Sequence, residues 1–403
     1  MAGEILLEAD WPTTALGEVV KNFDSKRVPL SSRERQLRQG KYPYYGAAGC
    51  IDHVDDYLFE GLHLLVGEDG SVIRPDGRPF LQLVNGKFWV NNHAHVLRGD
   101  DETETKFLFY ALETCNVSGM VTGAVQPKIT QANLNSIRFC YPPRKAREKI
   151  VRVLGALDDK IELNRRMNAT LEAMARALFQ SWFVDFDPVR AKLDGRPPAA
   201  LDPATAALFP DAFDETALGH IPHGWEVKTL GEVIELAYGK PLKAEDRKNG
   251  PVCVYGANGP VGWHDEKLVS GPGIVVGRKG NPGVVTWAHG DFYPIDTTFY
   301  VEPRGECCSL YFLYYALSLH NLANLSADSA VPGLNRNHAY MSKQVIPSEP
   351  VLTAFDSQIA PIFASIHANT EQSRTLATLR DTLLPKLLSG ELSSNGVNQY
   401  SYA

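Results

Sequence analysis

The sequence has no run of apolar residues long enough to cross a bilayer, and it has few cysteines. A transmembrane helix needs roughly 18 uninterrupted apolar residues, and no segment approaches that length. The first five residues, Met1–Ile5, have neither the positive start nor the apolar core of a secretory signal. Six cysteines in 403 residues, without a C-x-x-C pair, indicate reduced thiols rather than a disulfide framework. These absences predict a cytoplasmic protein with no membrane contact.

Motifs of catalysis are missing as well. The chain has no G-x-x-x-x-G-K-[ST] segment for nucleotide phosphates and no G-x-S-x-G nucleophile elbow. It also lacks the [DNS]-P-P-[YF] tetrad with which amino-methyltransferases hold an extruded base. The sequence therefore predicts a protein that is not itself an enzyme.

The charge balance argues against one further class of protein. The chain has 40 Lys and Arg against 47 Asp and Glu, and its net charge of −7 does not fit a uniformly basic nucleic-acid coat protein. Its 44% hydrophobic content, with 17 Phe, 16 Tyr and 6 Trp, is typical of a folded protein. The length suits two or three domains.

Five short segments recur in the same order roughly 210 residues apart, a period that is too long for a solenoid. They are Leu16–Val20 and Leu230–Ile234, Tyr45–Gly49 and Tyr255–Gly259, Leu65–Gly70 and Val275–Gly280, Tyr110–Leu112 and Tyr315–Leu317, and Pro127–Ile129 and Pro332–Leu334. Phe88–Val90 and Ile274–Gly277 are predicted as strands, and residues 106–113 and 311–319 as short helices. The pattern predicts two homologous α/β domains.

Each repeat is followed by a long helical pattern. Apolar residues spaced by three and four positions predict a coiled-coil seam. The first seam is predicted to contain Ile150, Val153, Leu157, Asn164, Met167, Leu171, Met174 and Leu178, and the second Ile359, Ile362, Ile366, Asn369, Leu376, Leu379, Leu383 and Leu387. Pro385 should kink or end the second helix. Because each repeat supplies one such helix, we expect a long antiparallel pair related by a pseudo-two-fold axis.

These patterns divide the chain into six segments. Proline recurs so densely between residues 184 and 222 that we expect an irregular connector there. The predicted segments are a first α/β domain at 1–143, a first long helix at 144–183, a linker at 184–222, a second α/β domain at 223–347, a second long helix at 348–392 and a tail at 393–403.

Basic and amide side chains recur at matching loops of the two repeats. Asn and Gln can pair with adenine and Arg or Lys with guanine in the major groove, and Lys and Arg neutralise phosphates. The residues expected to contact DNA are Lys26, Arg27, Arg33, Arg35, Tyr45, Gln126, Lys128 and Thr130 in the first repeat and Lys240, Lys243, Tyr255, Asn258, Arg278, Lys279, Asn335 and Arg336 in the second. The turn at Glu68 and Asp69 is acidic where the second repeat has Arg278 and Lys279, which disfavours a phosphate contact there in the first repeat.

Together these features resemble the specificity subunit of type I restriction-modification systems. The shared features are an L-G-E-V opening, a Y-G-A-x-G turn, a V-G-x-x-G strand and turn, and a terminal helix in each repeat. Residues 177–192 look like the stretch that closes the first helix in that family, and residues 383–392 are similar to its usual ending. The resemblance covers essentially the whole chain.

The resemblance implies that each of the two α/β domains is a target-recognition domain. Each would read one half of a bipartite, asymmetric site in double-stranded DNA. The helices would set the distance between the halves and dock two methyltransferase subunits, and restriction subunits would join the complex. S-adenosylmethionine, ATP and magnesium would be bound by those partners, and this chain would hold no cofactor.

Two alternatives from other classes remain open. One is a metal-dependent nuclease that uses His93 and His95 with Asp100 or Asp101. The other is a coiled-coil adaptor whose heads bind ligands other than DNA. The nuclease should bind a divalent metal, and the adaptor should show no salt-dependent affinity for DNA.

Overall fold

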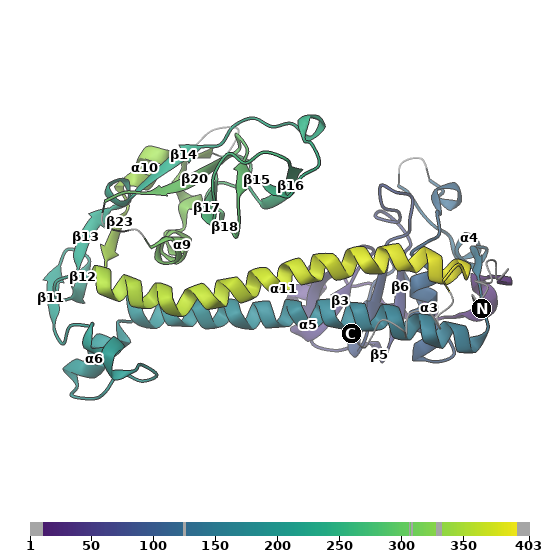
Figure 1. The fold of residues 1–403 in the computed structure, drawn as a ribbon. Coiled ribbons are helices and arrows are strands. Elements are labelled where there is room, and N and C mark those ends of the chain that lie inside the picture. Colours follow the sequence, from purple (N-terminus) through teal and green to yellow (C-terminus); the bar gives the residue numbers. More distant parts are fainter. Residues whose placement is uncertain (1–10, 124–125, 306, 308, 328–332, 393–403) are drawn as a thin grey trace, which may run out of the picture. The chain divides into compact units, whose positions relative to one another are not determined.

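The structure is a computed structural model that describes residues 11–123, 126–305, 307, 309–327 and 333–392. It contains two compact units, unit 1 with residues 1–163 and 372–403 and unit 2 with residues 164–371. Two long helices, α5 (Arg144–Phe183) and α11 (Glu349–Ser389), contribute residues to both units (Figure 1). The compact units therefore differ from the six predicted segments, because parts of both helices are built into each core.

Unit 1 contains the first repeat, which is built on two small sheets. One sheet has the strand order β2 (Lys21–Asn22), β9 (Ala94–Arg98), β6 (His63–Gly67) and β7 (Leu81–Val84). The other has the order β4 (Cys50–Val54), β3 (Gln39–Tyr45), β8 (Lys87–Val90) and β5 (Phe59–Glu60). Helix α3 (Glu102–Leu112) packs on the first sheet, and β1 (Thr13–Ala15) pairs with β10 (Arg138–Cys140).

Unit 2 repeats this topology. One sheet has the order β14 (Ile234–Tyr238), β20 (Thr298–Pro303), β17 (Gly273–Gly277) and β18 (Val285–Ala288), with helix α9 (Leu310–Leu319) packed on it. The other has β16 (Gly259–His264), β15 (Val252–Gly256) and β19 (Phe292–Pro294), and β13 (Glu226–Thr229) pairs with β23 (Lys343–Ile346). The predicted strands and short helices are confirmed, and both repeats are mixed α/β.

The strand register fixes which residues correspond. In unit 1, Gly67 on β6 pairs with Ala94 on β9, and in unit 2, Gly277 on β17 pairs with Thr298 on β20. His95 of the first repeat therefore corresponds to Phe299 of the second. The residue after each glycine, Glu68 or Arg278, begins the corresponding turn.

The L-G-E-V segments form a short helix at the start of each repeat. In α8 (Leu230–Val233), the carboxylate of Glu232 accepts hydrogen bonds from the backbone N–H of Thr229 at 2.6 Å and from its hydroxyl at 2.7 Å. In α1 (Leu16–Val19), a Cβ on Gly17 would lie only 2.8 Å from a side-chain atom of Asn135 in α4 (Gln131–Asn135). The shared glycine therefore allows this helix to pack closely on its neighbour.

The predicted irregular linker is wrong for most of residues 184–222. This segment contains α6 (Asp187–Leu193), α7 (Pro203–Ala207) and a hairpin of β11 (Phe213–Thr216) and β12 (Gly219–Pro222). Pro188 and Pro203 lie in the first turns of α6 and α7, where proline is tolerated because its missing N–H would have no helical partner. Two of the prolines in this segment therefore mark helix starts rather than an irregular chain.

The seam of α5 differs from the predicted one at two positions. Met167 and Met174 are exposed, 41% and 55% respectively, and the adjacent residues Asn168 and Ala175 are less exposed. One stripe of less exposed positions along this part of α5 contains Ile161, Asn164, Asn168, Leu171, Ala175, Leu178 and Trp182, spaced alternately by three and four. Apolarity alone favours the methionines at the seam, whereas Asn168 occupies it through hydrogen bonds.

The seam of α11 needs one correction. Leu379 is 44% exposed, and the adjacent Arg380 is half-buried and pairs with Asp158 of α5 at 2.7 Å in unit 1. The Asp158 carboxylate also accepts a hydrogen bond from the Tyr110 hydroxyl at 2.6 Å. Pro385 lies in the last turns of α11, which ends at Ser389.

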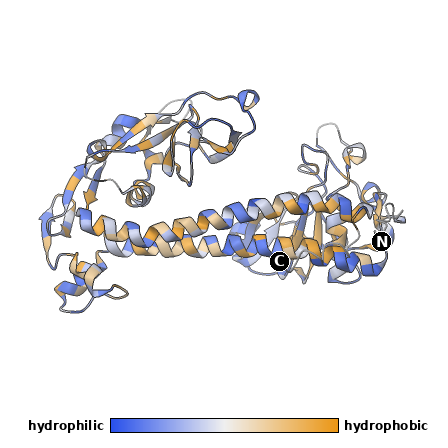
Figure 2. Ribbon diagram, viewed as in Figure 1, coloured by the Kyte–Doolittle hydropathy of each residue, from blue (hydrophilic) through white to orange (hydrophobic). Residues whose placement is uncertain are grey.

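Hydrogen bonds in unit 2 show that the two helices run antiparallel. The Asn369 side chain donates to the side-chain oxygen of Asn168 at 2.9 Å, and Asn168 donates to the carbonyl of Ile366 at 3.3 Å. Asn164, nearer the start of α5, donates to the carbonyl of Asn369 at 3.3 Å. Figure 2 shows polar and apolar residues interspersed along both helices.

Each unit buries different side chains where its repeat meets the helices. In unit 1 the contacts are aliphatic, and in unit 2 they are largely aromatic. The unit 1 cluster includes Ile150, Leu154, Leu384, Leu387 and Leu388, and the unit 2 cluster includes Phe179, Trp182, Phe183, Phe355 and Ile359. Among the described helices, none combines the length and apolarity needed to cross a membrane.

Candidate nucleic-acid interface

A turn and a loop lie side by side at the same place in both repeats. In unit 1 the turn after β6 meets residues 126–130, because the Ile129 N–H donates to the Glu68 carbonyl at 2.8 Å. In unit 2 the turn after β17 meets residues 333–335 in the same way, because the Leu334 N–H donates to the Arg278 carbonyl at 2.9 Å. We call these pairs the first and the second recognition edge.

Glycine makes the turn of each edge possible. Gly70 and Gly280 have φ angles of 77° and 83°, a backbone conformation that other residues rarely adopt. The hydrogen bonds that join each turn to its loop use backbone atoms only, so they do not require particular side chains at the edge. The same geometry can therefore present different chemistry in the two repeats.

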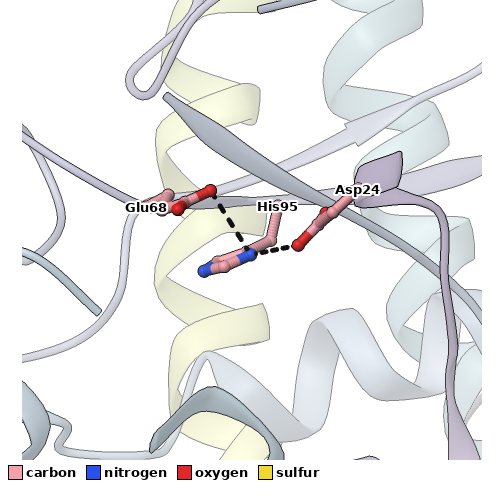
Figure 3. A group of neighbouring side chains, drawn as sticks. All are labelled: Asp24, Glu68 and His95. Carbon is pink, nitrogen blue, oxygen red and sulfur yellow. Dashed lines mark hydrogen bonds and ion pairs between the residues drawn. The ribbon is translucent and has the colours of Figure 1, made fainter. Parts of the chain in front are cut away.

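A buried group of charged side chains lies beneath the first recognition edge. His95, which is 1% exposed, lies between the carboxylates of Asp24 and Glu68 (Figure 3). Its Nδ1 is 2.6 Å from Oδ2 of Asp24 and 3.6 Å from Oε2 of Glu68, and its Nε2 is 2.9 Å from the Ile129 carbonyl. We call Asp24, Glu68 and His95 the His95 cluster.

Two cations pair with Glu68 of the His95 cluster. Arg27 hydrogen-bonds Glu68 and donates to the Ala94 carbonyl at 2.7 Å, and the ammonium of Lys128 lies 3.1 Å from Glu68. Arg27 and Lys128, both expected to contact DNA, thus have internal carboxylate partners. Lys128 remains half-exposed, whereas Arg27 is largely buried.

The pKa values of the His95 cluster follow from these contacts. Burial alone would lower the pKa of His95, but the hydrogen bonds to Asp24 and to the Ile129 carbonyl raise it above its usual value. Burial would raise the pKa of Glu68, but the hydrogen bond from Arg27 and the charge of His95 hold it below its usual value. Burial would also raise the pKa of Asp24, but hydrogen bonds, chiefly the one from His95, hold it below its usual value.

The His95 cluster could place three ligand atoms around a metal ion, but its chemistry does not fit one. A histidine binds a metal through a ring nitrogen that carries no proton. Both ring nitrogens of His95 face oxygen acceptors, and Glu68 already pairs with two cations. The cluster is therefore an ion-pair network whose ligand atoms are already used by other partners.

The second recognition edge has aromatic and basic groups in the corresponding place. The guanidinium groups of Arg278 and Arg336 lie 4.8 and 5.1 Å from the ring centre of Tyr238, which is 50% exposed. Arg278 also donates to the Asp296 carbonyl at 3.0 Å, and Arg336 pairs with Glu235 at 3.1 Å. We call Tyr238, Arg278 and Arg336 the Tyr238 stack.

Tyr238 was missed by sequence reasoning, although one signal was available. It corresponds to Asp24, since both lie eight residues after the leucine that opens the L-G-E-V helix. The exposed ring of Tyr238 holds two guanidinium groups at the surface through cation–π contacts. The basic residues were recognised, but their neighbour was not.

Other predicted contacts of the first repeat divide into exposed and internal residues. Lys26 and Arg33 are exposed, as is Gln126 in the loop of the first edge. Arg35 pairs with Asp52 at 2.8 Å, and Tyr45 packs edge-on against Phe88. Thr130 caps helix α4, and Asn335 likewise caps α10 (Arg336–Met341) of the second repeat.

In the second repeat, Lys240, Lys243, Asn258 and Lys279 are exposed. Asn258 accepts a hydrogen bond from the Asn281 side chain. Tyr255 is only 6% exposed and packs edge-on against Phe292, so it belongs to the core. The expectation that Tyr255 contacts DNA is therefore corrected, because its strand faces it inward.

The four residues proposed for a nuclease do not form a common site. His93 contacts Asp69, whereas His95 contacts Asp24. Asp100 pairs with Lys21 at 2.9 Å, and Asp101 caps α3 and pairs with Arg144 at 2.8 Å. Each carboxylate thus has a separate structural partner.

The family of type I restriction-modification DNA specificity domains matches both repeats, at residues 8–173 and 222–376. The chain belongs to this specificity family. Two matches instead of one agree with the duplication seen in the sequence and in the strand order. The boundary of the first match lies within α5, as does the boundary between the compact units.

Similar members of the specificity family are known from distant organisms. The specificity subunit of the type I restriction enzyme HindI from Haemophilus influenzae is 28% identical, over 95% of this chain and all of that protein. The MjaIX specificity subunit from Methanocaldococcus jannaschii is 22% identical, over 96% of this chain and 97% of that protein. The crystal structure of the S subunit from M. genitalium, 18% identical, shares the fold with a TM-score of 0.59 over 96% of this chain and 98% of that one.

Proposed function

We propose that this chain is the DNA-reading subunit of a type I restriction-modification complex and that it performs no chemistry itself. Each recognition edge reads one half of a bipartite, asymmetric site in double-stranded DNA. One observation supports this most strongly: two copies of one backbone arrangement carry the acidic Glu68 in one case and the basic Arg278 in the other. A duplicated scaffold with divergent side chains is what reading two different half-sites requires.

The residues proposed to contact DNA follow from exposure. In the first repeat they are the exposed Lys26, Arg33 and Gln126 together with Lys128. In the second they are Lys240, Lys243, Asn258, Lys279 and the Tyr238 stack. Arg27, Arg35, Thr130 and Asn335 hold the local structure through internal pairs and helix caps.

Two methyltransferase subunits need a docking surface that occurs twice. Met174 on α5 and Leu379 on α11 correspond when Tyr110 is aligned with Tyr315, and both are exposed. Single exposed apolar residues are common, but their occurrence at equivalent positions of both helices is what a docking surface used twice requires. We propose that each docks one methyltransferase subunit, which brings S-adenosylmethionine, and that restriction subunits add ATP and magnesium. Such a complex works where the DNA lies, so we place it in the cytoplasm.

The docking proposal predicts that Met174→Glu and Leu379→Glu fold normally but each weaken binding of one methyltransferase subunit. A charged side chain exposed to water does not destabilise the free chain, but burying it in a dry interface without a partner makes the free energy of binding less favourable. Native mass spectrometry of the co-expressed complex measures the subunit ratio, and Glu172→Gln on the exposed face of α5 is the control. Complexes that keep both subunits in both glutamate variants would contradict this surface.

The reading function is tested by lengthening the helices. One heptad inserted near Asn164 and another near Asn369 adds about 10 Å to each helix and keeps the seams in register. At about 3.4 Å per base pair, the halves of the modified site should lie about three base pairs further apart. Sequencing of methylated sites in cells measures this gap. Altered half-sites at an unchanged gap would refute the proposal.

A further inference from the structure

We propose that His95 is a positioning residue for the first half-site: as an imidazolium it holds the loop of residues 126–130 in the shape that reads DNA. The second half-site has no such dependence. This inference rests on the proposed function, which it deepens by naming a group that controls one recognition edge and not the other.

The protonation state of His95 follows from geometry. Asp24 accepts at Nδ1 and the Ile129 carbonyl accepts at Nε2, and neither oxygen can donate a proton in return while Asp24 is ionised. Both ring nitrogens must therefore carry hydrogen. A neutral ring would point a lone pair at one of these oxygens in a site that is closed to water.

The carbonyl that His95 holds belongs to the recognition loop itself. Ile129 lies between Lys128 and Thr130, and the loop also receives a hydrogen bond from the Gly70 N–H to the Pro127 carbonyl at 3.0 Å. His95 on β9 is thus hydrogen-bonded to the loop that also contains the exposed Gln126. Loss of the imidazolium releases one of the ties that define this loop.

Charged groups from every neighbouring element face the ring or its partners. Asp24 and Arg27 come from the first turn after β2, Glu68 from the end of β6 and Lys128 from the loop. His93, in the turn just before β9, contacts Asp69 in the turn after β6. The lowered pKa values of Asp24 and Glu68 keep both carboxylates ionised near neutrality, so neither carboxylate changes charge as the pH rises above neutral.

The second repeat supplies an internal control. Phe299 replaces His95, Tyr238 replaces Asp24 and Arg278 replaces Glu68, while the backbone bond from Leu334 to Arg278 is retained. Arginine and phenylalanine do not titrate between pH 6 and pH 9. The second edge should therefore keep its shape across that range.

The experiment measures how well the assembled complex, this chain with its methyltransferase subunits, discriminates duplexes altered in one half-site. Fluorescence anisotropy at pH 6 to 9 gives the affinity ratio between cognate and altered DNA for each half. As the pH rises through the raised pKa of His95, the proton is lost, and first-half discrimination should fall about tenfold, the loss of about one base contact. Second-half discrimination should change less than about twofold.

Two variants separate His95 from its neighbour. His95→Gln should show low first-half discrimination at every pH, while His93→Gln should keep the wild-type pH profile. A first-half profile that is flat with pH in the wild type, or that becomes flat in His93→Gln alone, would overturn the inference. If His95→Gln does not assemble with its partners, the pH dependence of first-half discrimination in the wild-type complex alone tests the inference. A wild-type complex that reads no bipartite site would instead refute the proposed function.

Discussion

In the first repeat the turn after β6 is acidic and lies over a buried histidine, whereas in the second the corresponding turn is basic and stacks on an exposed tyrosine. Both turns are joined to their loops by the same backbone hydrogen bond, to the carbonyl of Glu68 or of Arg278. Because that bond needs no particular side chain, the edge can diverge while the fold is retained. The comparison shows how one scaffold can present different chemistry at the same place, as the proposed reading of two half-sites requires.

The largest expected effect concerns the cores that join each repeat to the helices. Phe355 contacts three aromatic rings, with Phe183 nearest at 4.9 Å between ring centres, whereas the corresponding Ile150 packs among leucines. Phe355→Ala should lower the free energy of unfolding by about 4 kcal/mol and Ile150→Ala by about 3 kcal/mol. Urea denaturation measures both. A larger loss for Ile150→Ala would show that the aliphatic core is the more tightly packed one.

A smaller difference is expected at two corresponding tyrosines. Tyr110 donates to Asp158, which also pairs with Arg380, whereas Tyr315 packs its ring at 5.3 Å from Phe179. Tyr110→Phe removes a hydrogen bond to a charged group and should cost about 2 kcal/mol. Tyr315→Phe keeps the ring and should cost less than about 1 kcal/mol. Equal midpoints in urea would contradict the proposed difference.

The smallest effect concerns the exposed residues of the two turns. Lys279→Ala should reduce the slope of log affinity against log salt by about one, because one phosphate contact is lost. Asp69→Ala, at the corresponding position, should not reduce the slope, because an acidic residue makes no phosphate contact. Salt titrations of DNA binding by the assembled complex measure both slopes. A reduced slope in Asp69→Ala would remove the chemical contrast between the two turns.

The repeat was readable from the sequence because five matches keep their order, and the α/β character followed from strand and helix patterns. The seams were only partly predictable. Both Met167 and Asn168, three and four residues after Asn164, have a spacing that fits the seam, and apolarity favours Met167. The structure places Asn168 there because Asn369 of the other helix hydrogen-bonds it, a contact that the sequence does not reveal. Similarly, His95 and Asp24 lie 71 residues apart, so their contact could not be predicted from spacing.

Unit 1 is built from two distant segments of the chain, residues 1–163 and 372–403. On the ribosome, the first repeat emerges early, but Leu384, Leu387 and Leu388 are the last residues to reach its core. Unit 2 is continuous from 164 to 371 and is complete before them. The repeat whose synthesis begins first therefore completes its core last, because the apolar face of α5 in unit 1 is covered only once the end of α11 has been made.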